Sequence, residues 1–219
     1  MSKQTWQIKI NNSFGINFKC HMWQDEMRNK DFSSIINFAK KNIVAKNLHI
    51  ADFKHESRYW DKYNLFVEMK EDKTIQDILK YIKKSYKNFV KVTNGKEEKV
   101  WINGWLNTMT KGMQLQKHCH ANHENAYLSG NLVLTDIKTS KTSFAIPDWS
   151  SPNQYKIYNV VNKKGYFNLF PQWLYHWVEP IQEDLRIVLG FDLHLNKAVN
   201  YYWKYESNID WPIKRAIKL

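Results

Sequence analysis

Four histidines have the spacing of a metal site. His118, His120 and His123 fall within six residues, and His176 lies far downstream in a short aromatic segment. Successive side chains of a β-strand alternate between its faces, so His118 and His120 on one strand would project together. A further strand could carry His176 to them. Neutral imidazole binds iron, zinc, copper or nickel, so the pattern predicts a metal site, with His123 as a less favoured ligand.

Arg186 is the candidate for holding an anionic ligand. It lies ten residues after His176, at the head of an apolar run that predicts a strand. A guanidinium keeps its charge and can form two parallel hydrogen bonds to a carboxylate. The alternative is a surface ion pair with Glu183 or Asp184. We favour the ligand role because of the position of Arg186 at the start of an apolar strand.

The composition indicates one folded domain. Of 219 residues, 43 % are hydrophobic and 15 % aromatic, enough for a substantial core rich in large rings. Two cysteines give neither a disulfide framework nor a zinc-ribbon spacing, which suits a reducing compartment. The chain has no long apolar run and no apolar leader at its start. We therefore expect a cytoplasmic protein without a membrane partner.

The formal charge of +12 raises the question of a nucleic-acid partner. Only four of the 33 basic residues are arginine, although arginine is preferred for contacts with phosphates and bases. The lysines are scattered and accompanied by many asparagines, which resembles a coding bias. Nucleic acid is thus a possible partner but not the favoured one.

The order of the predicted elements indicates a mainly β fold with flanking helices. Apolar periodicity predicts helices over 31–46 and from Thr74 to about Asn94, the second with a capping box at Thr74. Strands are expected near 101–109, 114–120, 127–135, 142–146, 155–161, 165–170, 175–178 and 185–194. About eight short strands predict a double-stranded β-helix, a cupin-like jelly roll with the N-terminal helices packed outside.

This order also divides the chain, read as a single domain over 1–219, into three parts. Residues 1–99 would form a helical or mixed support, 100–194 the jelly-roll catalytic core, and 195–219 an aromatic tail packed on that core.

A set of spaced residues resembles the 2-oxoglutarate and Fe(II)-dependent oxygenases, and more narrowly their bacterial and phage-encoded branch. The resemblance covers roughly residues 100–194, and its second half is the more specific part. A phage gene expressed in a bacterial host would also suit the lysine and asparagine bias. The residues that carry it are Trp105, Gly112, His118-Cys-His120, Ser129-Gly130, Phe170-Pro-Gln-Trp-Leu-Tyr-His176-Trp-Val-Glu-Pro180 and Arg186-Ile-Val-Leu-Gly-Phe191.

The resemblance implies a cofactor, a co-substrate and a reaction. Fe(II) would be held by His118, His120 and His176, and Arg186 would pair with the far carboxylate of 2-oxoglutarate. Oxidative decarboxylation of 2-oxoglutarate with O2 would be coupled to oxidation of an unidentified substrate. Hydroxylation of a protein side chain or a small molecule is the favoured outcome.

The chain departs from the family pattern at three positions. His120 stands where a carboxylate is commoner, so weak metal retention is expected, with Glu124 as the nearest alternative ligand. Asn131 falls in the strand where the family usually has a tyrosine, and is a guessed second partner of 2-oxoglutarate. Val188 replaces a common serine or threonine.

Two other functions stay open. One is a cupin-like, non-redox metal-binding protein or isomerase that uses zinc or manganese. The other is a basic nucleic-acid-binding module whose histidines are incidental. The aromatic residues Trp149, Trp173, Tyr175 and Trp177 would line a substrate pocket or, as we favour, belong to the core.

Overall fold

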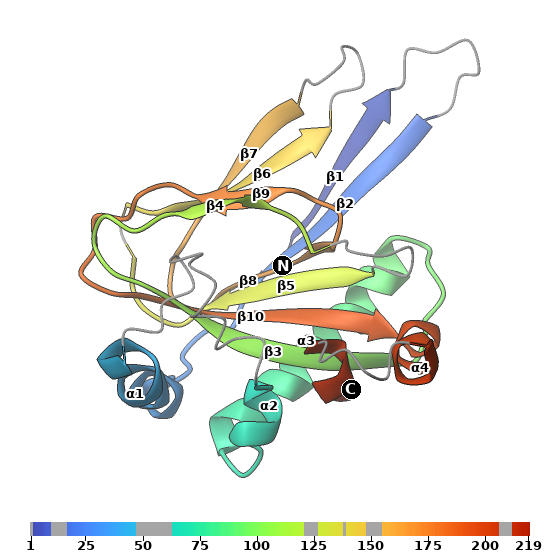
Figure 1. Cartoon of the computed structure of the whole chain (residues 1–219). Helices are drawn as coiled ribbons and strands as arrows, with labels where there is room; N and C mark the ends of the chain where they lie inside the picture. Colours follow the sequence, from blue (N-terminus) through green and yellow to red (C-terminus); the bar gives the residue numbers. More distant parts are fainter. Residues whose placement is uncertain are drawn as a thin grey trace.

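A computed structural model describes residues 2–9, 17–46, 63–120, 127–137, 139–147, 155–205 and 212–219. Two antiparallel sheets face each other, and helices cover the far side of the larger sheet (Figure 1). This is the predicted mainly β jelly roll with helices outside. His123, Glu124 and Trp149 lie outside the described residues.

The strands of the two sheets form an interior between them. The larger sheet has the order β1 (Ser2–Lys9), β2 (Asn17–Glu26), β8 (Tyr166–Pro171), β5 (Leu128–Val133), β10 (Arg186–Leu195), β3 (Val100–Met109) and β11 (Ile217–Lys218). The smaller sheet has the order β4 (Leu115–His118), β9 (His176–Val178), β6 (Lys141–Pro147) and β7 (Tyr155–Val161).

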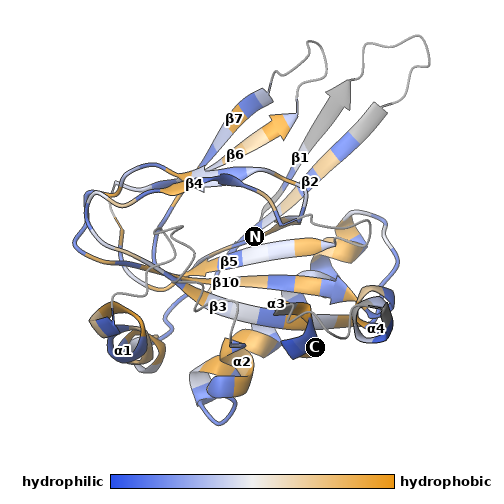
Figure 2. Ribbon diagram, viewed as in Figure 1, coloured by the Kyte–Doolittle hydropathy of each residue, from blue (hydrophilic) through white to orange (hydrophobic). Residues whose placement is uncertain are grey.

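Three of the helices bury apolar residues in one cluster with strands of the larger sheet. The helical segments are α1 (Ser33–Asn42), η1 (Val44–Lys46), α2 (Leu65–Glu68), α3 (Lys73–Val92), α4 (Asn196–Tyr205) and η3 (Pro212–Arg215). In α3, Ile75, Ile78 and Ile82 are fully buried and belong to one cluster with Leu189 and Phe191 of β10. Figure 2 shows hydrophobic and hydrophilic residues interleaved along β10, so this strand serves both the helical layer and the interior.

The structure departs from the predicted elements in four places. The N-terminal region contributes the hairpin of β1 and β2 to the larger sheet, through pairing of β2 with β8, and is not only a helical layer. Asp72, whose side chain accepts a hydrogen bond from the Ile75 amide, caps α3 in place of Thr74. The predicted strand 114–120 ends at His118. The C-terminal segment contains α4, which packs Ala198 and Val199 in a cluster with Trp101.

Within the described residues, no helix has both the length and the apolar character that crossing a membrane requires.

Candidate metal centre

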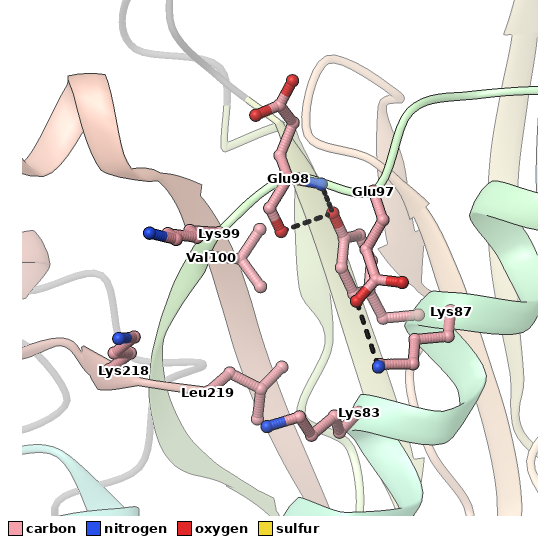
Figure 3. A pocket seen from close by; sticks show the side chains of 9 residues that line it. Lys83, Lys87, Glu97, Glu98, Lys99, Val100, Lys218 and Leu219 are labelled. Carbon is pink, nitrogen blue, oxygen red and sulfur yellow. Dashed lines mark hydrogen bonds and ion pairs between the residues drawn. The ribbon is translucent and has the colours of Figure 1, made fainter.

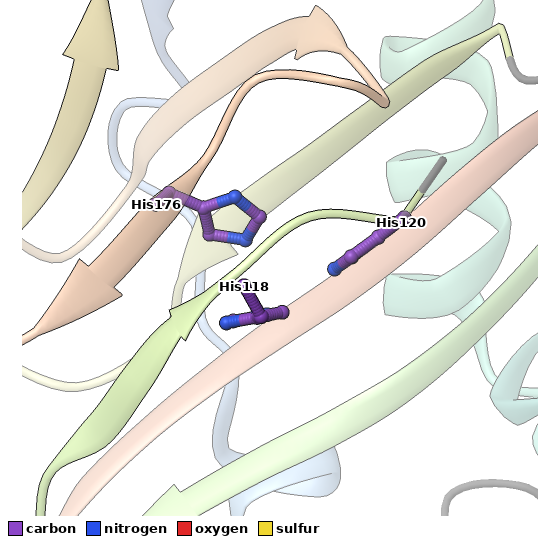
Figure 4. A group of neighbouring side chains, drawn as sticks. All are labelled: His118, His120 and His176. Atoms are coloured by element: carbon purple, nitrogen blue, oxygen red, sulfur yellow. The ribbon is translucent and has the colours of Figure 1, made fainter. Parts of the chain in front are cut away.

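The structure brings His118, His120 and His176 together between the two sheets (Figure 4). One potential ligand atom from each ring lies within 4.8 Å of those of the other two. The ring centroids of His118 and His176 are 4.3 Å apart, and those of His120 and His176 are 5.1 Å apart. A metal lies about 2.1 Å from a ligating imidazole nitrogen, so small side-chain rotations would close this group around one cation.

Strand pairing and one loop contact position the three rings. His118 ends β4 directly opposite His176 of β9, with a register shift after Leu115. His120 follows the strand end, and its backbone amide donates a hydrogen bond of 2.9 Å to the Gln172 carbonyl. His118 and His120 do lie together, but the expectation that they share one strand is wrong, because His120 reaches the cluster from beyond the end of β4.

Gln172 is an anchor that the sequence analysis did not single out. Its side-chain oxygen accepts a hydrogen bond from the Tyr127 amide, and its side-chain amide donates to the carbonyls of Leu128 and Leu193. These bonds tie the segment that holds His120 to β5 and β10. The only signal in the sequence was the location of Gln172 in the quoted segment before His176.

The hydrogen bonds at Nδ1 select the nitrogen that each ring can offer to a metal. His118 Nδ1 lies 2.7 Å from the Gln116 carbonyl, and His176 Nδ1 lies 3.0 Å from the Leu174 carbonyl. A carbonyl only accepts, so both rings carry their proton on Nδ1 and leave Nε2 free as a ligand.

A carboxylate lies behind the third ring. Asp192 Oδ1 lies 2.7 Å from His120 Nδ1, and the Ser129 hydroxyl donates to the same oxygen. Burial alone would raise the pKa of Asp192, but His120, His194 and Ser129 favour its charged form and keep that pKa below its usual value. The sequence offered a signal for Asp192. It lies six residues after Arg186 on the same predicted strand, and an even spacing places both side chains on one face of the sheet.

The surroundings keep two of the rings neutral. Burial, reinforced by the neighbouring His120, lowers the pKa of His118 to about 4. Burial, with His118 and His120 nearby, also lowers the pKa of His176 well below its ordinary value. Phe144 and Phe170 pack around His176, with ring centroids 5.8 Å and 5.0 Å away. Neutral imidazoles in an apolar shell are ready to bind a cation at physiological pH.

Arg186 is buried at the head of β10, and is not a surface ion pair. It is 2 % exposed, and one of its amino groups contacts Met109 Sδ at 3.4 Å. Burial lowers its pKa to about 10, although the negative charge of Glu183 acts to raise it. Its Nε has no hydrogen-bond partner in the described part of the chain. Met109 clusters with Val178, two residues after His176, so Arg186 faces the same interior as the histidines.

Asn131 also faces this interior, but it is bonded to a neighbouring strand. Its side-chain oxygen accepts a hydrogen bond of 2.9 Å from Asn168, which itself accepts one of 3.1 Å from Gln24. Val188 is buried in a small apolar cluster with Val133. On β3, the residue paired with Val188 is Asn107, whose side-chain oxygen is buried and has no partner among the described residues.

The described aromatic residues near His176 do not belong to the core. Trp173 is 41 % and Tyr175 49 % exposed, and Trp177 is partly exposed. They are too exposed for the core that we favoured. Instead, Lys117 Nζ lies over the Tyr155 ring, 3.5 Å from its centroid, and within 5.7 Å of that of Trp177.

A separate hollow of about 300 Å³ lies between α3, the start of β3 and the C-terminal residues (Figure 3). Its lining includes Lys83, Lys87 and Lys99, but Glu97 forms an ion pair with Lys87 at 3.1 Å. None of the three clustered histidines lines it. With charges of both signs on its walls, it is not selective for an anion.

Comparison with known proteins gives the fold. No protein-family model and no curated protein matches the chain. The structure is similar to that of a prolyl-4-hydroxylase from Pseudomonas putida, with a TM-score of 0.56 and 11 % identity over 80 % of this chain and 88 % of that one. It also aligns with an oxidoreductase of the 2OG-Fe(II) oxygenase family from Burkholderia pseudomallei, with a TM-score of 0.44 and 14 % identity over 55 % of this chain and 58 % of that one. At 11 % identity, the first of these alignments shows that the chain shares the jelly-roll fold of the Pseudomonas enzyme.

Proposed function

We propose that this protein is a 2-oxoglutarate- and Fe(II)-dependent oxygenase that acts as a hydroxylase. His118, His120 and His176 hold the iron, and Arg186 binds the far carboxylate of 2-oxoglutarate. The observation that carries the proposal is a buried guanidinium that is hydrogen-bonded to Met109 but to no carboxylate among the described residues. It faces the same interior as three clustered histidines. Burying a charge is costly unless a ligand of opposite charge compensates it, and 2-oxoglutarate supplies one.

The residues of the site fit the iron and the co-substrate. Three imidazoles whose free nitrogens converge suit Fe(II) and leave coordination positions open. When bound, Fe(II) would supply activation of O2. 2-Oxoglutarate and the substrate would each give two electrons and take up one oxygen atom, which gives succinate and CO2 from the first and a hydroxyl group on the second. The chain binds the co-substrate at Arg186, fixes the protons of His118 and His176 at Nδ1, and excludes water around His176 with Phe144 and Phe170.

The substrate class is a protein side chain or a small molecule, with a nucleic-acid base as the subordinate candidate. Asn131 is the proposed second polar contact of 2-oxoglutarate.

Anaerobic spectroscopy tests the proposal. Addition of Fe(II) and then 2-oxoglutarate to the metal-free protein should give a visible charge-transfer band, and admission of O2 should release succinate. His176→Ala should lose the band, whereas Arg186→Ala should keep it only at higher 2-oxoglutarate concentrations. His21→Gln, a histidine bonded to Thr5 in the β1–β2 hairpin, should behave as the wild type.

The same cluster would also serve a non-redox metalloprotein, because three histidine ligands suit zinc as well as iron. Metal analysis of protein purified without added iron separates the two functions. Stoichiometric zinc or manganese, with no band and no succinate after iron loading, would contradict the oxygenase and favour the alternative.

A further inference from the structure

Asp192 is a partly buried carboxylate that the proposed reaction does not use directly. Its side chain is 14 % exposed, and its Oδ1 contacts His120 Nδ1 at 2.7 Å. The Ser129 hydroxyl donates to that oxygen and lies 3.0 Å from the same ring nitrogen. Among the described residues, the group that could hold one cation consists of the three histidines, so Asp192 lies outside it, behind one of its ligands.

This contact distinguishes His120 from the other two rings. His118 and His176 each have a backbone carbonyl at Nδ1, at 2.7 Å and 3.0 Å, and a carbonyl carries no net charge. His120 alone of the three has a carboxylate there. A carboxylate fixes the ring proton at Nδ1, as a carbonyl does, but also makes the opposite nitrogen a stronger donor to a cation.

We propose that Asp192 is the anionic partner of the metal site and acts through His120 as a positioning residue. The inference rests on the metal site of the proposed function and deepens it. A site with two histidines and one carboxylate receives its negative charge from a direct ligand. Here the charge lies one residue further out, and reaches the cation through the imidazole of His120.

The arrangement changes the expected charge balance. Three neutral imidazoles around a divalent cation leave two net positive charges, and Asp192 reduces these to one before any co-substrate binds. Weak metal retention, expected from the absence of a carboxylate at position 120, does not then follow. Partners behind metal ligands typically contribute about 10- to 100-fold to metal affinity.

Calorimetric titration of the metal-free protein with Co(II) measures this contribution without any turnover. Asp192→Asn keeps an oxygen that can accept from His120 but removes the charge, and should weaken Co(II) binding by about 10-fold or more. Asp184→Asn is the matched control, because it removes one exposed carboxylate near the same strand. It should bind Co(II) as the wild type does, and both variants should show wild-type far-ultraviolet circular dichroism.

Two results separate the inference from the proposed function. Loss of Co(II) binding in His176→Ala together with equal affinities for Asp192→Asn and Asp184→Asn would overturn only the role of Asp192. Wild-type protein that binds Co(II) no better than His176→Ala would overturn the metal site, and the inference with it.

Nitrogen-15 spectra of the histidine rings in the metal-free wild type give a second test that needs no variant to fold. His120 should carry a proton on Nδ1, the nitrogen that faces Asp192. A ring protonated on Nε2 alone would show that Asp192 does not orient His120 for metal binding, and would overturn the proposal.

Discussion

The two faces of the larger sheet have opposite chemistry, although the same strands supply both. On the outer face, Leu189 and Phe191 of β10 are fully buried against the helices. On the inner face, the same strand presents Arg186, which is buried, and Asp192, which is partly buried. Burial of apolar area on the outer face stabilises the fold, whereas desolvation of the charged side chains on the inner face destabilises it. The outer face therefore supplies stability, and the inner face holds groups kept for binding.

Truncation of the outer face should have the largest effect on stability. Phe191 is fully buried, and its ring stacks on Phe167 with centroids 5.7 Å apart. Phe191→Ala should lower the free energy of unfolding by about 3–5 kcal/mol, measured by urea denaturation. Trp203→Ala in α4, where the side chain is 57 % exposed, is the control and should cost under about 0.5 kcal/mol. A loss below about 1 kcal/mol at Phe191 would contradict the division between the two faces.

Acid should destabilise the metal-free protein through the inner face. The pKa of His118 is about 4 in the fold, against an ordinary value of 6.5, and that of His176 is also lowered. Below pH 6.5 these two histidines become protonated in the unfolded chain but stay neutral in the folded one. The stability present above pH 6.5 is therefore lost as the pH falls toward 4, by up to about 1.4 kcal/mol per histidine per pH unit.

Urea denaturation of chelator-treated protein between pH 7.5 and 4.5 measures this slope. His118→Gln removes one of the two groups and should flatten the slope, while Trp203→Ala should leave it unchanged. An equal slope in His118→Gln and wild type would show that His118 does not carry the effect.

The sequence predicted that helices cover the outer face, and it predicted most of the site residues in the interior. Alternation along 185–194 fixes which residues share a face, and the aromatic segment around His176 indicated a strand that could carry it to His118 and His120. Contacts that depend on cross-strand register or loop geometry could not be read in this way. The bond of Asp192 to His120 and the anchoring of His120 by Gln172 are of this kind.

The N-terminal hairpin shows the same limit. Ser2–Lys9 carries only two apolar residues in eight, Trp6 and Ile8, and their spacing of two is a strand signal too short to stand out. Cys20 and Met22, both fully buried at a spacing of two, were the available signal for β2.

Replacement of Arg186 by an apolar residue should separate stability from binding. Arg186 is 2 % exposed, so desolvation of its charge lowers the stability of the fold. Among the described residues, no carboxylate is hydrogen-bonded to the guanidinium. Arg186→Met has a similar length beside Met109, so the free energy of unfolding without co-substrate should stay equal or rise by about 1 kcal/mol or more. Binding of 2-oxoglutarate to the Fe(II)-loaded protein should weaken by about 10- to 100-fold. A destabilised variant with unchanged 2-oxoglutarate binding would reverse the roles given to the two faces.

Asn131 offers the smallest and most discriminating change on the inner face. Its side-chain oxygen accepts from Asn168, so its amide group is the part left to contact a ligand carboxylate. Asn131→Asp keeps an acceptor for Asn168 but replaces that amide by negative charge, and should raise the half-saturating 2-oxoglutarate concentration by about fivefold, the equivalent of one hydrogen bond. Co(II) affinity, measured by calorimetry, should not change, because the side chain of Asn131 is bonded to Asn168 and not, as that of Asp192 is, to a histidine of the cluster. If the half-saturating concentration stays at the wild-type value, Asn131 belongs to the strand-to-strand amide contacts alone, and the co-substrate site consists of Arg186 without it.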